Sequence, residues 1–275
     1  MRGYATWIIA PRKLSVLQKE FNVRFLSNFN EIYLVNEYPK SGGTWLKLML
    51  SEALQLPAWT KNDPQWGSCV MQAHWLKPRT RCRTIALFRD GRDVMVSLYY
   101  HSFFRNEFQN AEYTEYMKEK FNFSDLNDIR SNLLPFMQVV FDTPISPAFS
   151  WSDFASNWLG RDDVVVCTYE ELRSDTVRTL QRLVRELTKR NLNYDAAKAI
   201  VDKYTMDNMR KRLVHATDAE QKNNVEVSFM RKGAVSGWSH AFSDEALDWF
   251  EHRAGAALDM LGYPRGRPLL TTEQK

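Results

Sequence analysis

The chain has 275 residues, of which 44% are hydrophobic and 25% are charged. This is the composition of an ordinary globular protein, and a chain of this length can bury a substantial core. The formal net charge is +4, with 37 Lys and Arg against 33 Asp and Glu. This excess is too small to indicate a nucleic-acid partner, so we expect none, but it suits a site for an anionic ligand.

Cys69, Cys82 and Cys167 show neither a redox-motif spacing nor a zinc-ligand spacing. We therefore predict buried free thiols in a reducing compartment and no metal site. The short apolar run at residues 7–10 is not a convincing signal peptide, because Pro11 and two basic residues end it. Nowhere is an apolar stretch long enough to span a bilayer. We expect a soluble, cytoplasmic protein without a transmembrane segment.

The first predicted unit of secondary structure is a strand, a loop and a helix. Residues 31–36 form a short apolar run that ends at a turn signal, which predicts a buried strand. A glycine-containing loop follows at residues 38–43. Residues 44–54 are rich in Leu, Lys and Met, which favours a helix.

A second unit begins with the apolar run at residues 84–88, which predicts another strand. Residues 89–92 form the turn after it, and a helix then runs to about His101. Asp93 is the expected N-cap of this helix, because a carboxylate there can accept from the first backbone N–H groups.

A third strand is predicted at residues 164–167, and an amphipathic helix follows it near residues 174–190. Asp175 or Ser174 is the expected N-cap. Strands that alternate with helices predict an α/β fold, with a central parallel sheet flanked by helices on both faces. We assign residues 1–275 to a single domain of this kind.

Ligands of parallel sheets bind at the carboxyl ends of the strands. The loops at residues 38–45, 89–97 and 168–172 all leave strands at that edge, so we expect them to converge. Residues 103–147 interrupt the pattern with charges, amides and many aromatic residues: Phe103, Phe104, Phe108, Tyr113, Tyr116, Phe121 and Phe123. This stretch is either a helical excursion packed on the domain or a cover over an acceptor pocket.

The loop between the first strand and its helix reads YPKSGGTW and predicts a phosphate site. Gly42 and Gly43 let backbone N–H groups approach an oxyanion, and the helix N-terminus adds its partial positive charge. Lys40 supplies a mobile cation, and Ser41 and Thr44 supply hydroxyl groups. The Walker A pattern GxxxxGK(S/T) is absent, which disfavours ordinary ATP or GTP hydrolysis.

This loop closely resembles the 5′-phosphosulfate loop of the cytosolic-type sulfotransferases. These enzymes have a P-loop NTPase-like fold and transfer a sulfuryl group from 3′-phosphoadenosine 5′-phosphosulfate (PAPS), leaving adenosine 3′,5′-bisphosphate (PAP). The resemblance covers roughly residues 31–105 and 148–242. It implies that Arg89 and Ser97, eight residues apart, bind the 3′-phosphate of the nucleotide.

The resemblance extends to the carboxy-terminal half of the chain. Arg231, Lys232 and Gly233 resemble the segment that closes over the nucleotide and grips its 3′-phosphate. Further matches imply a site for the adenine, in which an aromatic face stacks on the base. Its residues are Trp45, Tyr169, Thr205 and Met206.

His74 is the predicted general base, because it precedes the 84–88 strand as the family's catalytic histidine does and an imidazole titrates near neutrality. Lys40 would stabilise the leaving oxygen in an in-line transfer. His101 is the rival histidine, and it matches one that is structural in the family. A carboxylate from the 103–147 stretch, such as Glu107 or Asp125, is the other alternative.

Among the departures from the family pattern, Gly43 stands where a threonine is usual, and Gln72 where a lysine is usual. They keep open a non-catalytic PAP- or PAPS-binding protein on the same fold. A P-loop nucleotide or small-molecule kinase is a weaker alternative, since it requires Mg²⁺ ligands and usually a Walker A motif. The expected acceptor is a small molecule or glycan with a hydroxyl group or an amine. The oligomeric state is not predicted.

Overall fold

The fold is seen in a computed structural model that describes residues 17–60, 66–77, 82–104, 111–209 and 237–267. The chain forms two compact units that alternate along the sequence. Unit 1 comprises Met1–Tyr38, Gly42–Phe88 and Asn157–Tyr204, and unit 2 comprises Pro39–Ser41, Arg89–Ser156 and Thr205–Lys275. The assignment of residues 1–275 to one domain stays a prediction.

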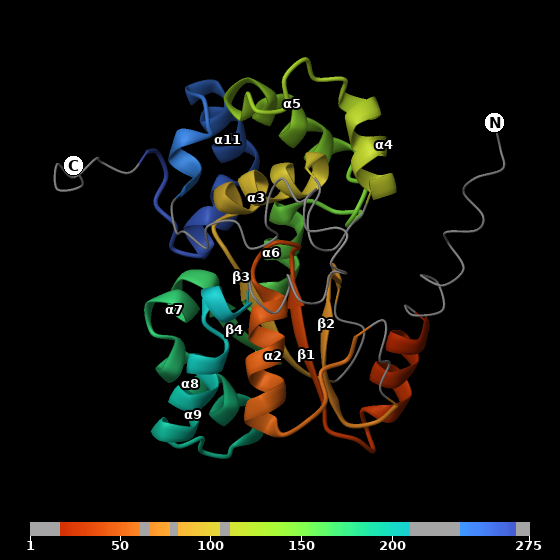
Figure 1. The fold of residues 1–275 in the computed structure, drawn as a ribbon, viewed down its shortest axis with the longest axis vertical. Coiled ribbons are helices and arrows are strands. Elements are labelled where there is room, and N and C mark those ends of the chain that lie inside the picture. The colour runs from red at the N-terminus through yellow and green to blue at the C-terminus, as the bar shows by residue number, and fades with distance from the viewer. Residues whose placement is uncertain (1–16, 61–65, 78–81, 105–110, 210–236, 268–275) are drawn as a thin grey trace. The chain divides into compact units, whose positions relative to one another are not determined.

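Unit 1 contains a four-stranded sheet in which every pair of neighbouring strands is parallel (Figure 1). Its strands are β1 (Ile32–Glu37), β2 (Cys69–Ala73), β3 (Arg83–Phe88) and β4 (Val164–Thr168), in the order β2-β1-β3-β4. In the register of the sheet, Val35 lies between Gln72 of β2 and Ile85 of β3. All four strands therefore end at one edge of the sheet.

The three strands predicted at residues 31–36, 84–88 and 164–167 are confirmed within about one residue. β1 is buried along its whole length, which explains the apolar run over its first four residues. β2 was missed, because its five residues include the polar Gln72 and no turn signal marks its end. His74 is the first residue after this missed strand.

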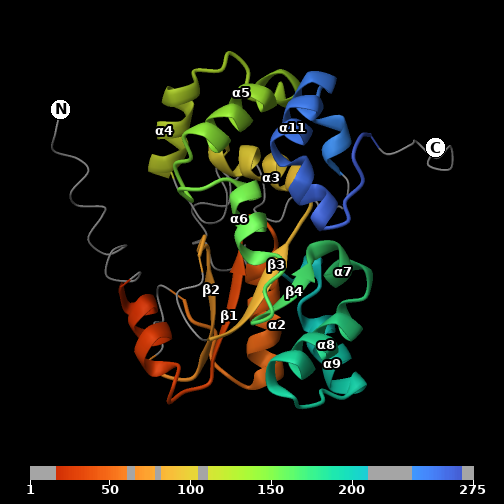
Figure 2. The same cartoon turned by 180° about the vertical axis from the view of Figure 1, so that it is seen from behind.

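Helices cover both faces of the sheet, which confirms the predicted class. Glu37 points to the face where α2 (Gly43–Leu54) begins, because its carboxylate accepts from the Gly43 N–H. On the opposite face, Val23 from the segment η1 (Asn22–Leu26) packs in one cluster with Leu34 and Met71. The described residues of unit 1 also form α7 (Tyr169–Ser174), α8 (Thr176–Thr188) and α9 (Tyr194–Lys203). α8 contacts β3, β4, α2 and α9 (Figures 1 and 2).

The helix boundaries follow from caps in the sequence. Asp175 accepts from the Arg178 N–H and is the N-cap of α8, which decides between the two predicted caps. In unit 2, α3 (Gly91–Phe103) is capped by Asp90, whose side chain accepts from the Arg92 N–H. The predicted cap Asp93 was wrong, because α3 already begins at Gly91 and Asp93 lies inside its first turn.

Unit 2 packs its helices around α3. α4 (Ala111–Phe121), α5 (Ile129–Asp142), α11 (Asp244–Met260) and the short η3 (Gly237–His240) all contact α3 or one another (Figure 2). α6 (Trp151–Trp158) contributes residues to both units.

The described part of the predicted excursion at residues 103–147 is largely helical, and several of its aromatic residues pack in the core of unit 2. Phe103 contacts Phe121, Phe123 and Phe136, with ring centroids 5.4, 5.5 and 5.7 Å away. Phe103 and Phe136 are fully buried. This packing accounts for these rings as core residues. A role of the excursion as a cover over an acceptor stays a prediction, and Phe108 lies outside the described residues.

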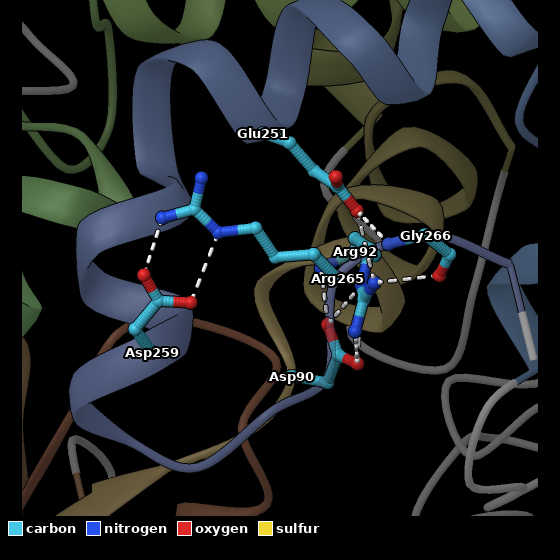
Figure 3. Close-up of polar contacts among 6 residues, drawn as sticks. All are labelled: Asp90, Arg92, Glu251, Asp259, Arg265 and Gly266. Carbon is cyan, nitrogen blue, oxygen red and sulfur yellow. Dashed lines mark hydrogen bonds and ion pairs between the residues drawn. The ribbon is translucent and has the colours of Figure 1, made fainter.

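A buried arginine ties the start of α3 to the carboxy-terminal part of unit 2 (Figure 3). Arg92 is 1% exposed, and its Nη2 lies 2.8 Å from Asp90 Oδ2. Its Nη1 donates to the Gly266 carbonyl at 3.4 Å, and Glu251 accepts from the Gly266 N–H at 2.7 Å. The guanidinium also lies 4.1 Å from the ring centroid of Trp238. This charge is therefore satisfied by its surroundings within the unit.

Candidate functional site

The loop between β1 and α2 has the backbone conformation of an anion-binding turn. Lys40 has a φ of 79° and Gly42 a φ of 103°, both in the left-handed region. A non-glycine residue rarely adopts this conformation, and Lys40 adopts it at a cost of order 1 kcal/mol. Two reasons require a glycine at position 42. The first is its left-handed backbone, and the second is that a Cβ at this position would lie 2.8 Å from the Tyr169 ring.

Two contacts of the loop involve residues that directly follow strands. In unit 1, Gly42 lies against Tyr169, which follows β4. In unit 2, the Arg89 Nη1 donates to the Lys40 carbonyl at 3.1 Å. Each contact joins the loop to a residue directly after β4 or β3 within a single unit, and the convergence of all three loops stays a prediction.

Ser41 is the buried hydroxyl of the loop. It is fully buried, and its Oγ has no hydrogen-bond partner among the residues that the structure describes. A buried hydroxyl without a partner is costly, so such a group calls for a ligand or a water. A phosphate or sulfuryl oxygen would satisfy it. Ser41 therefore fits the nucleotide implied by the sequence.

The sequence analysis missed a carboxylate from the end of β1 that lies against the first turn of α2. Glu37 is 2% exposed, and its Oε2 accepts from the Gly43 N–H at 2.5 Å. Its Oε1 accepts from the Gln72 Nε2 at 2.6 Å, and the Gln72 Oε1 accepts from the Thr44 hydroxyl at 3.1 Å. The two departures from the family pattern, Gly43 and Gln72, are therefore bonded to the same side chain. Its only signal in the sequence is a glutamate at the end of a buried strand.

Lys47, one turn further along α2, belongs to this polar group. Its Nζ donates to the Trp59 carbonyl at 3.2 Å. Burial lowers the pKa of Lys47, and the charge of Glu37 partly opposes this effect. Glu37 and Lys47 thus place opposite charges inside unit 1 near the start of α2.

His74 has the hydrogen bond that a general base requires. It is exposed, directly after β2, and its Nδ1 lies 3.0 Å from the Glu37 carbonyl oxygen. A carbonyl oxygen only accepts, so this contact assigns the proton to Nδ1 and the lone pair to Nε2. An imidazole oriented in this way can take a proton from a substrate hydroxyl at Nε2.

His101 has the opposite character. It lies half-buried in α3, and its pKa is lowered to about 3, mainly by burial and further by the positive charge of Lys40. A group with so low a pKa is a poor proton acceptor at neutral pH. This environment agrees with a structural role. Of the carboxylate alternatives, Asp125 accepts from the Asn127 N–H at 2.8 Å, and Glu107 lies outside the described residues.

The predicted adenine residues lie in different surroundings. Trp45 is 4% exposed, its Nε1 donates to the Tyr204 carbonyl at 2.7 Å, and its ring meets Tyr169 edge to face at 6.2 Å. Both rings therefore pack inside unit 1. Thr205 and Met206 follow α9 and are exposed and half-buried.

The predicted 3′-phosphate residues lie in unit 2. Arg89 comes directly after β3, and Ser97 is half-buried on α3. Arg231, Lys232 and Gly233 lie outside the described residues.

Cys69, Cys82 and Cys167 are free and buried, which confirms the predicted thiols. Burial raises the pKa of Cys167 to about 12 and that of Cys69 to about 11. In the part of the chain that the structure describes, no three His, Cys, Asp or Glu side chains cluster as a metal site would. The helices described there are also too short or too polar to cross a bilayer.

A family model described as Sulfotransferase domain matches residues 70–262, which is more than half of the chain. The chain therefore belongs to the sulfotransferase family. The β1–α2 loop precedes the matched range. Among curated proteins, the chain is similar to Sulfotransferase 2B1 of Rattus norvegicus, with 24% identity over 88% of this chain and 73% of that protein. It is equally similar to 3-beta-hydroxysteroid sulfotransferase of Cavia porcellus, with 24% identity over 90% of each chain.

Two solved structures show the same fold at low identity. Mouse sulfotransferase SULT7A1 complexed with PAP has a TM-score of 0.57 and 15% identity, over 87% of this chain and 92% of that chain. Retinol dehydratase in a complex with retinol and PAP has a TM-score of 0.62 and 14% identity, over 92% of this chain and 87% of that chain. The P-loop-like α/β fold predicted from the sequence is thereby confirmed.

Proposed function

We propose that this chain transfers a sulfuryl group from PAPS to an acceptor hydroxyl or amine, leaving PAP. The observation that carries the proposal is the β1–α2 loop, with Lys40 and Gly42 both left-handed and the buried Ser41 hydroxyl between them. Such a loop at the start of a helix suits the 5′-phosphosulfate end of the donor. Membership of the sulfotransferase family supports the same reading.

The donor supplies the sulfuryl group, and the residues of this chain have three tasks. Lys40 places a cation where negative charge grows on the leaving oxygen. Ser41, Gly42 and Thr44 orient the 5′ end through hydroxyl and backbone groups. Arg89 holds the 3′-phosphate with its guanidinium, with Ser97 donating a further hydrogen bond.

His74 accepts the proton of the attacking hydroxyl at Nε2. The Nδ1 contact with the Glu37 carbonyl supports this role, because it selects the tautomer that a base needs. The low pKa of His101 argues against the rival histidine. The transfer is in line between two oxygens, so positioning and charge stabilisation carry most of the catalysis.

The acceptor is a small molecule or glycan with a hydroxyl group or an amine. One relative is named for a hydroxysteroid, and one structure of the same fold contains retinol. These names support a hydrophobic alcohol as the first acceptor class to test. The protein is proposed to act in the cytoplasm, where buried free thiols stay reduced.

The test combines labelled PAPS, a panel of alcohols, phenols, amines and sugars, and variants. His74→Ala is expected to lower turnover by at least 100-fold with PAP affinity unchanged, because the base touches the acceptor and not the donor. His252→Ala, an exposed residue of α11, is the matched control. Near-normal turnover of His74→Ala would show that another group is the base.

Donor binding has its own test. Lys40→Ala and Arg89→Ala are each expected to weaken PAP binding in calorimetry, because each removes a charge that contacts a phosphate. Unchanged affinity in either variant refutes that residue's assignment. A thermal shift with ATP and Mg²⁺ but none with PAP would instead favour the kinase alternative.

A non-catalytic nucleotide-binding protein is the second candidate. Gln72 favours it, because the resemblance places a lysine there, and this side chain is bonded to Glu37 instead. PAP binding without sulfate transfer to any acceptor of the panel would support it. Transfer to one acceptor would exclude it.

A further inference from the structure

The carboxylate of Glu37 fills the space that a side chain at position 43 would need. Gly43 does not have a positive φ, so its backbone would tolerate a side chain. A Cβ on Gly43 would, however, lie 2.5 Å from Glu37 Oε1 and 2.9 Å from Oε2, closer than real Cβ atoms come to other atoms. The carboxylate, and not the backbone, therefore excludes a side chain at position 43.

The carboxylate also takes the place of a ligand anion. Helix N-termini bind anions because their first N–H groups have no partner within the helix. The Gly43 N–H is one of the groups expected to bind the 5′ end of the donor, and Glu37 accepts from it at 2.5 Å. Gln72 holds the other carboxylate oxygen at 2.6 Å, so two bonds orient the side chain.

We propose that Glu37 is an internal competitor for the 5′-phosphate group of the nucleotide. In this proposal, which rests on the proposed function, its carboxylate caps the start of α2 and must leave the Gly43 N–H when a 5′-phosphate binds. Glu37 thereby lowers the affinity for nucleotides with a 5′-phosphate. Contacts with the 3′-phosphate must then supply the binding free energy that is lost at the 5′-phosphate. Gly43 and Gln72 are then adaptations to Glu37 rather than independent losses.

The negative charge of Glu37 is expected to weaken the binding of PAP. A carboxylate near the dianionic 5′-phosphate repels it, and its bond with the Gly43 N–H is charge-assisted. Glu37→Gln keeps the size of the side chain but removes the charge. This variant is expected to bind PAP roughly tenfold more tightly than the wild type. Adenosine 3′-monophosphate lacks the 5′-phosphate, so its affinity should be unchanged.

The experiment measures both nucleotides by calorimetry against the full-length wild type, Glu37→Gln and Glu52→Gln. Glu52 lies in the last turns of the same helix and pairs with Lys203, so its variant removes an equal charge far from the loop. Tighter binding of PAP alone, and only in Glu37→Gln, supports the proposal. Equal or weaker PAP binding overturns it, as does an equal gain for both nucleotides.

A second set of variants tests the shared space. Gly43→Thr alone should weaken PAP binding, because the new side chain collides with Glu37. In the Glu37→Thr background the same change should restore or improve it. Additive effects would overturn the proposal. If neither the wild type nor any variant binds PAP, the proposed function fails together with the inference, whereas a wild type that binds PAP isolates the inference.

Discussion

Replacing His101 should make the free energy of unfolding fall less steeply as the pH is lowered below 6.5. The pKa of His101 is about 3 in the folded protein, lowered by burial first and by Lys40 second. The ring also faces Tyr113, with centroids 6.4 Å apart. In the unfolded chain the imidazole has an ordinary pKa near 6.5, so the two states bind the proton at different pH. His101→Gln removes this group while keeping a polar side chain of similar size.

Acid lowers the free energy of unfolding because the folded and unfolded chains bind a proton at His101 at different pH values. Between pH 6.5 and pH 3 the unfolded chain is protonated at His101 and the folded chain is not, so acid favours unfolding. The contribution of the neutral imidazole is present in full above pH 6.5 and is lost as the pH falls toward 3. From pH 6.5 to pH 4.5 the wild type should lose about 1–2 kcal/mol more than His101→Gln, the lower value allowing for solvent at the half-buried ring.

Urea unfolding at several pH values, followed by tryptophan fluorescence, measures this difference. His252→Gln is the matched control, because that histidine is exposed on α11. Lys40→Met should reduce the slope slightly, since the charge of Lys40 is the second cause of the low pKa. Parallel pH profiles of the wild type and His101→Gln would refute the argument and would reopen His101 as a candidate base.

Two further predictions concern buried groups. Arg92→Met should lower the free energy of unfolding by about 3–5 kcal/mol, because it removes the guanidinium that pairs with the buried Asp90 carboxylate; a urea midpoint close to that of the wild type would contradict this. The native thiol of Cys167 should resist alkylation at pH 8, because burial raises its pKa to about 12, and unfolded protein should react readily; mass spectrometry of the labelled peptides detects either outcome.

Local patterns predicted much of this fold. β1, β3 and β4 were found because each is a short apolar run that ends at a turn, and α2 and α8 because their residues suit helices. β2 was missed, since five residues with a glutamine in the middle carry too weak a pattern. The cap of α3 was assigned three residues too late, because two aspartates in one turn satisfy the same rule.

Some features of the candidate site follow from the sequence, and others follow only from the tertiary structure. The order of Lys40, Ser41 and Gly42 between a strand and a helix is local information, so the sequence by itself was enough to predict a phosphate site at this loop. It also determined Gly43 and Gln72 as departures. Only the tertiary structure joined these two through Glu37, because Gln72 lies 35 positions away and reaches the carboxylate only when β1 and β2 pair. Contacts between neighbouring strands depend on register, and no local pattern records them.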